Sequence, residues 1–173
     1  MACSAAPGGT LSTLKGFMSI YHIAQVNIAE MRAPLDSETM TGFVARLDEI
    51  NALAERTPGF VWRLKGDANN ATALRIFDNH SIIINMSVWD SIDALYQYTY
   101  YSDHAQVYRQ RGEWFRRLQN HMLALWWVPA GHTPTPQEAK DKLAYLNAHG
   151  ATPLAFNFKQ RYSVEEMISA INT

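Results

Sequence analysis

The chain has 173 residues, of which 47% are hydrophobic and 18% are charged, a balance typical of one globular domain with a substantial core. Its 15 Lys and Arg against 16 Asp and Glu argue against nucleic acid or an anionic membrane as a main partner, because both need a basic surface. No apolar run reaches the roughly 18 residues of a transmembrane helix. The single cysteine, Cys3, allows neither an internal disulfide nor a cysteine-based zinc site. We therefore expect a cytoplasmic protein that holds no metal.

Composition and periodicity divide the chain into three segments. Residues 1–17 are small, polar and rich in glycine, which predicts a disordered tail. Residues 18–130 carry alternating strand and helix patterns and form the expected α+β domain. Residues 131–173 predict a C-terminal helical extension that packs on the same domain.

The elements of the α+β domain follow from apolar periodicity of two for strands and 3.6 for helices. They are, in chain order, a strand at 20–28, a helix at 40–53, a strand at 60–64, a strand at 81–89, a helical pattern at 91–120 broken at Ser102 and Asp103, and an apolar strand at 122–128. Asp90 is the expected N-cap of the second helical pattern.

Capping signals define the extension. Thr135, Pro136 and Glu138 combine a capping box with proline at the first helical position, and Gly150 stands where that helix should end. A weak strand is expected at 155–158. Ser163 and Glu166 then form a second capping box for a short last helix.

The order β-α-β-β-α-β is that of the ferredoxin-like split βαβ fold. Two helices would pack on one face of its sheet. The other face would carry apolar side chains together with a polar cluster, and its expected members are Ile23, Gln25, Asn27, Ile83, Asn85, Ser87 and Trp89, with Arg63 if its strand faces the same way. An exposed face of this kind predicts a homodimer that packs sheet to sheet as an α/β barrel.

Several segments resemble one bacterial family. They are HIAQVNIA at 22–29, PGFVWRL at 58–64, NMSVWDSIDAL at 85–95, LWWVPAGHTPTPQEA at 125–139, and the stretch containing Tyr101, Ser102, His104, Arg111, Trp114 and Phe115. In the same order, over about residues 20–158, they are similar to the domain-of-unknown-function family numbered 3291, within the dimeric α/β-barrel superfamily. The resemblance implies a ferredoxin-like dimer. That superfamily includes antibiotic biosynthesis monooxygenases, haem enzymes, muconolactone-type isomerases and stress-responsive barrels, so the resemblance does not select a reaction.

The second helical pattern carries the candidate catalytic residues. His104, Tyr108 and Arg111 lie at helical spacing among apolar residues. In the functional interpretation Arg111 stabilises an anionic or carbonyl oxygen, Tyr108 contacts the substrate and His104 moves a proton near neutral pH. In the structural interpretation Arg111 reaches water or pairs with a carboxylate, and His104 bonds a backbone carbonyl.

The strands supply candidate substrate-binding residues. Trp62 and Trp126 would be flat walls for an aromatic ligand, with core and interface packing as the alternative. His22 is a lone polar residue on an apolar strand face, and is either a ligand contact or a core histidine. Asn85 belongs to the polar cluster, which is either a binding site or a wet subunit interface.

These residues lead to three functional hypotheses. The first is a cofactor-independent enzyme of monooxygenase or isomerase type that acts on an aromatic or conjugated carbonyl compound. The second is a haem-binding protein or haem enzyme with His104 or His22 as axial ligand. The third is a non-catalytic ligand-binding or stress-response barrel. The expected partners are a second copy of the chain and a small hydrophobic or aromatic ligand.

Overall fold

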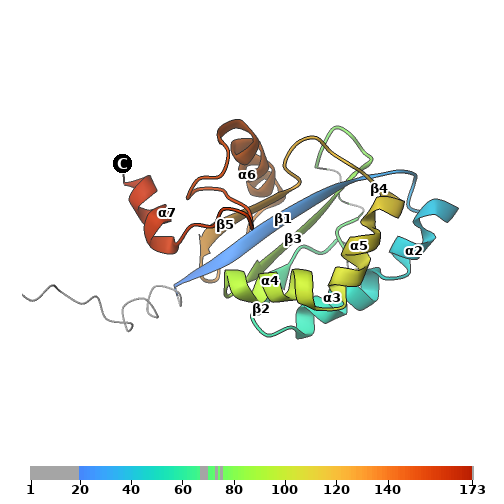
Figure 1. The fold of residues 1–173 in the computed structure, drawn as a ribbon, viewed down its shortest axis with the longest axis horizontal. Helices are drawn as coiled ribbons and strands as arrows, with labels where there is room; N and C mark the ends of the chain where they lie inside the picture. Colours follow the sequence, from blue (N-terminus) through green and yellow to red (C-terminus); the bar gives the residue numbers. More distant parts are fainter. Residues whose placement is uncertain (1–19, 67–69, 73, 75, 173) are drawn as a thin grey trace, which may run out of the picture.

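The computed structural model describes residues 20–66, 70–72, 74 and 76–172, so the expected tail at 1–17 lies outside the described residues. Its elements are β1 (Tyr21–Met31), η1 (Glu38–Met40), α2 (Thr41–Val44), α3 (Leu47–Arg56), β2 (Phe60–Arg63), β3 (Ile82–Trp89), α4 (Ile92–Tyr101), α5 (His104–Trp114), β4 (Phe115–Arg116), β5 (Leu123–Pro129), α6 (Pro136–His149) and α7 (Val164–Ile171) (Figure 1). The protein is a mixed α+β structure. None of its described helices is long and apolar enough to cross a membrane.

The sheet is open and antiparallel, with five strands. β1 is central: it pairs with β3 on one side, and on the other with β5 over Tyr21–Asn27 and with β4 at Glu30 and Met31. β2 forms the edge beyond β3. The four main strands lie close to the predicted ranges, because each carries a strong apolar alternation or run.

The helices differ from the prediction mainly where they begin and end. The expected break at Ser102 and Asp103 is present. The second helical pattern does not continue to 120, because residues 115 and 116 pair with the end of β1 as β4. The N-cap of α4 is Ser91, whose side chain accepts a hydrogen bond from the backbone N–H of Ala94, and not the expected Asp90.

The C-terminal extension begins and ends its helices as predicted. Thr135 caps α6, Pro136 is at its start, and Gly150 closes it with a φ of 73°. Only the Thr135 half of the predicted capping box is described, because the Glu138 carboxylate contacts Trp126 Nε1 and His132 Nε2 instead. Ser163 and Glu166 form both hydrogen bonds of a capping box at α7. The weak strand at 155–158 is reduced to isolated bridges, of which the one between Phe156 and Leu125 joins it to β5, while Ala155 pairs with Thr152 and Asn157 with Gln160.

Both faces of the sheet are covered within the chain. One face packs against α3, α4 and α5 (Figure 1). The opposite face packs against α6 and against Ala71, Leu74, Ile76 and Phe77; its buried strand residues are Ala24, Val26, Ile84, Met86, Val88, Ala124, Trp126 and Val128. The homodimer stays a prediction. The face on which it was based, with Ile23, Ile83 and Trp89, is covered by α3, α4 and α5, and the extension covers the opposite face.

Candidate functional site

A row of polar side chains crosses the sheet on the face that α3, α4 and α5 cover. In the strand register Gln25 of β1 lies opposite Ser87 of β3, which lies opposite Arg63 of β2. One step along, Asn27 lies opposite Asn85. We call these five residues the polar band. Sequence analysis grouped them correctly but placed them on the wrong face, because they lie under the first helices and not on an open surface.

The polar band separates two apolar clusters on the same face. On one side are Ile23, Ala54, Trp89, Leu95, Leu125 and Phe156. On the other side are Met31, Met40, Ile83 and Trp114. A sheet face that only packs against helices is typically apolar throughout. Polar groups in its middle therefore indicate a binding site or a buried hydrogen-bond network.

Two amides of the band, those of Gln25 and Asn85, are held by hydrogen bonds. Gln25 Nε2 donates to Asn85 Oδ1 at 2.8 Å and to Ser87 Oγ at 3.0 Å, and Trp89 Nε1 donates to the same Oγ at 2.9 Å. Gln25 and Ser87 are only 6% and 7% exposed. Asn85 is exposed although it lies in the middle of β3. Its oxygen accepts from Gln25, and its Nδ2 has no described acceptor, so these donors are available to a ligand oxygen.

Arg63 brings a buried charge to the edge of the band. Its side chain is 5% exposed, and its Nε donates to Glu55 Oε1 of α3 at 2.9 Å. Lys65 Nζ lies 2.9 Å from the same oxygen. Lys65 and Arg63 together hold the pKa of Glu55 below its usual range. The guanidinium is therefore neutralised by α3 and ties β2 to that helix.

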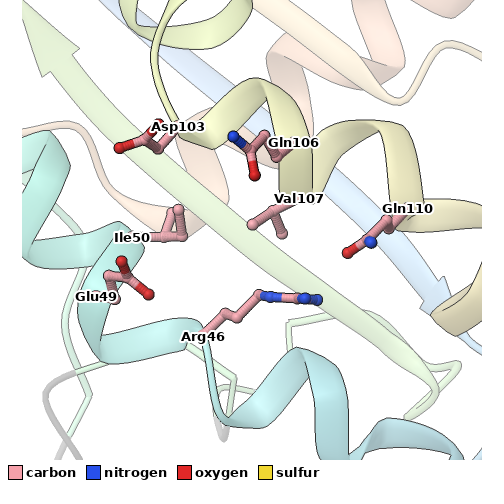
Figure 2. Close-up of a pocket in the computed structure, with 7 residues that line it drawn as sticks. All are labelled: Arg46, Glu49, Ile50, Asp103, Gln106, Val107 and Gln110. Atoms are coloured by element: carbon pink, nitrogen blue, oxygen red, sulfur yellow. The ribbon is translucent and has the colours of Figure 1, made fainter.

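A cleft of about 140 Å³ opens between α3 and α5 above the sheet (Figure 2). Its lining residues are Arg46, Glu49 and Ile50 near or on α3, and Asp103, Gln106, Val107 and Gln110 near or on α5. β3 passes directly behind them in Figure 2.

The packing of β3 places Asn85 between the parts of the strand that α4 and α5 cover, and Asn85 is not one of the residues that line the cleft. Ile83, two residues before it, packs in the cluster that includes Val107 and Trp114. Trp89, four residues after it, packs against Tyr98 of α4 with ring centroids 5.0 Å apart. Asn85 lies between these contacts and is exposed, so the helix layer leaves the strand open there.

His104 lies at the first position of α5, next to the cleft-lining Asp103. Its ring packs between Tyr98, at 4.7 Å, and Tyr108, at 6.4 Å. Nδ1 is 3.2 Å from the carbonyl oxygen of Thr99, which makes Nδ1 the protonated nitrogen and leaves Nε2 as the basic one. Burial lowers the pKa of His104, and the Thr99 contact offsets this only in part. The imidazole is therefore neutral at pH 7.

The lowered pKa predicts a pH dependence of stability. The unfolded ring binds a proton below about pH 6.5, whereas the folded ring resists it, so acidification through that value favours unfolding. We expect the free energy of unfolding to fall less in His104→Phe, which keeps the ring stack, than in the wild type when the pH is lowered from 7.5 to 5. Urea unfolding at both pH values measures this. Parallel losses in the two proteins would show that His104 is not the group responsible.

Arg111 is not in the site. It is exposed, its guanidinium donates to the Tyr108 carbonyl at 3.0 Å, and it lies 4.0 Å from the centroid of the Tyr108 ring. The prediction that it lies among core-facing residues is wrong, because the residues that α5 buries are Ala105 and Trp114. The structural interpretation, in which Arg111 reaches water, describes its position.

The other predicted binding residues lie on the opposite face of the sheet. Trp62 and Trp126 both pack in the cluster covered by α6, and Trp126 Nε1 donates to Glu138 Oε1 at 2.8 Å. His22 is opposite Val128 on the same face, and its Nδ1 is buried with no hydrogen-bond partner. Of the predicted binding and catalytic residues, only Asn85, His104 and the half-buried Tyr108 thus lie inside the layer that α3, α4 and α5 form with this face of the sheet.

Glu138 links this second face to the loop before α6. His132 Nε2 is 2.8 Å from Glu138 Oε2, while Trp126 holds the other carboxylate oxygen. Burial works against ionisation of Glu138, but the hydrogen bonds from His132 and Trp126 outweigh it, so its pKa lies below the usual value. The described part of the chain contains no group of three or more His, Cys, Asp or Glu that could hold a metal ion.

Sequence analysis missed Arg46, the cation that lines the cleft. Arg46 lies in the break between α2 and α3, where the helical periodicity of residues 40–53 is interrupted. A pattern that treats this segment as one helix assigns Arg46 to the solvent side. No local signal reveals that the chain restarts there.

Comparison with known proteins identifies the family but not an activity. Residues 22–170 match the family described as "Domain of unknown function (DUF3291)", and the chain belongs to this family. No curated protein matches the chain. Among solved structures, the NE2512 protein of unknown function from Nitrosomonas europaea matches with 10% sequence identity and a TM-score of 0.42, over 68% of this chain and 97% of that one.

Proposed function

We propose that this member of the DUF3291 family is a small-molecule enzyme whose substrate binds in the cleft between α3 and α5, above the polar band. The observation that carries the proposal is Asn85, an exposed amide in the middle of a strand that is otherwise covered by helices. The buried Gln25 holds the Asn85 oxygen, so the Nδ2 donors of Asn85 are preorganised for an oxygen atom of a ligand.

The residues at hand suit a conjugated or aromatic carbonyl compound. Amide N–H donors stabilise the charge that develops on a carbonyl oxygen when a neighbouring carbon loses a proton. His104 is a neutral imidazole at pH 7 with a basic Nε2, and it follows the cleft-lining Asp103 in the chain. Proton removal by His104 and oxygen stabilisation by Asn85 would form an enolate, the intermediate of an isomerase.

A monooxygenase of the cofactor-independent type would use the same enolate and add dioxygen to it. The isomerase is the simpler assignment, because it needs only the proton transfers that the described residues can perform.

The fold that we propose together with this function is the ferredoxin-like arrangement. Its support is the strand order β5-β1-β3-β2, with α3 after β1 and α4 and α5 after β3.

Proton exchange tests the proposed chemistry. A panel of aromatic and conjugated ketones is incubated with the protein in D₂O, and loss of the α-proton signal is followed by ¹H NMR. We expect enzyme-dependent exchange with at least one compound. Asn85→Leu should reduce it about 100-fold, the cost of removing one oxyanion donor, and His104→Phe should abolish it.

The matched control is Asn120→Leu, at an exposed position outside the cleft with no side-chain hydrogen bond in the described structure. It should exchange protons at the wild-type rate. Absence of exchange with every ketone, or exchange that Asn85→Leu leaves unchanged, would overturn the proposal. A Soret band after addition of haem would instead favour the haem-binding hypothesis.

A further inference from the structure

The cleft contains a cation that no carboxylate neutralises. Arg46 is half-buried at the start of α3, and its guanidinium lies 5.5 Å from the centroid of the Trp114 ring. Trp114 is itself only 3% exposed, so the ring is a fixed support. Among the ion pairs and side-chain hydrogen bonds of the described residues, none includes Arg46. Its N–H donors are therefore free to bind an anion.

Two carboxylates line the same cleft without a cationic partner. Glu49 lies three residues after Arg46, a spacing at which helical side chains often pair. The Arg46 side chain instead stacks on Trp114, and the carboxylates of Glu49 and Asp103 form no described ion pair or hydrogen bond. In Figure 2 Glu49 and Asp103 lie at one end of the cleft, while the Arg46 guanidinium extends toward Gln110 at the other.

We propose that the cleft takes a zwitterionic small molecule, whose carboxylate binds Arg46 and whose ammonium group binds Glu49 and Asp103. This inference rests on the proposed function only in using the same cleft; where both hold, the substrate is a conjugated carbonyl compound that also carries an amino-acid-like pair of charges. A volume of about 140 Å³ suits a ligand of amino-acid size, below the roughly 300–1,000 Å³ of pockets for larger ligands. Gln106 and Gln110 supply neutral hydrogen-bonding groups along the wall.

NMR titration of the ¹⁵N-labelled protein tests the charge pattern. The probes are 4-aminobutanoate, 5-aminopentanoate and 6-aminohexanoate, each compared with the carboxylate and the alkylammonium ion of the same chain length. We expect at least one amino acid to bind ten-fold or more tightly than both of its singly charged analogues. The amide signals that shift should be those of α5 and the start of α3.

Variants that remove charges show which end of the cleft binds the carboxylate of the ligand and which binds its ammonium group. Arg46→Gln should lower the affinity for the amino acid to that of the alkylammonium ion. The double variant Glu49→Gln and Asp103→Asn should lower it to that of the carboxylate. Arg109→Gln, an exposed position on α5 outside the cleft, is the matched control and should bind like the wild type.

Two results would overturn the inference. If the carboxylates bind as tightly as the amino acids, and the Glu49 and Asp103 changes have no effect, the cleft is an anion site. If no probe binds, while ketone exchange depends on Asn85, the cleft is catalytic but does not select a zwitterion. Zwitterion binding without any ketone exchange would support this inference and overturn the proposed reaction, so the two fail separately.

Discussion

Gly59→Ala is expected to destabilise the protein by about 3 kcal/mol. Gly59 connects α3 to β2 with a φ of +87°, and a Cβ atom there would lie 2.5 Å from the Cβ of Ala94 and 2.6 Å from Oδ1 of Asp90. The left-handed backbone costs an L-residue about 1–2 kcal/mol, and forcing an extra methyl group into a packed site adds about 1–3 kcal/mol. Urea unfolding monitored by tryptophan fluorescence gives the difference.

Gly131→Ala is the matched control for this prediction. Gly131 has the same φ of +87°, but a Cβ atom there would have no heavy atom within 4 Å among its described surroundings. Only the backbone cost then applies, and we expect a loss of about 1 kcal/mol. Equal losses in the two variants would mean that the contact of the 57–59 turn with α4 is looser than the structure indicates.

Local sequence patterns were sufficient for most elements of the fold. The capping box at Ser163 and Glu166 and the close of α6 at Gly150 involve residues three to fifteen positions apart, so one chain segment contains the whole signal. The break at Ser102 is equally local. Where an element ends through a distant contact the prediction failed: α5 ends at Trp114 because Phe115 pairs with Met31 of β1.

The same difference between local and distant contacts explains which features of the candidate site could be predicted. Strand alternation showed that Gln25, Asn85 and Ser87 share a face, because a period of two fixes relative orientation. It could not show which helices cover that face. The answer depends on α6, which comes after all the strands and packs against the Ala24 and Val26 side. The polar residues therefore lie under α3 and α5, although their grouping was read correctly.

Helix phase was a second source of error. The spacing of His104, Tyr108 and Arg111 places Arg111 with the apolar residues after the break at Ser102, but the residues that α5 buries are Ala105 and Trp114. Periodicity alone did not show which face of this short helix the sheet takes. Arg111 lies outside and stacks on Tyr108, while Arg46, at the break between α2 and α3, takes a place in the cleft.

Ser87 is the residue on which the buried part of the polar band depends. Its Oγ accepts hydrogen bonds from Gln25 Nε2 and Trp89 Nε1, both in the interior. Trp89 is fully buried and has no other described acceptor for its N–H. An alanine at position 87 would leave a tryptophan donor and one amide donor without partners, each at a cost of about 1–3 kcal/mol.

We therefore expect Ser87→Ala to lower the free energy of unfolding by about 3 kcal/mol, whereas Ser91→Ala, which removes the α4 N-cap and an exposed hydrogen bond to Asp90 Oδ1, should cost about 1 kcal/mol. Urea unfolding compares the two variants. Because Gln25 also holds the Asn85 oxygen, Ser87→Ala should in addition weaken ketone exchange, while Ser91→Ala should not. A Ser87→Ala protein as stable as the wild type would mean that these donors find water, and that the polar band is a hydrated channel continuous with the cleft.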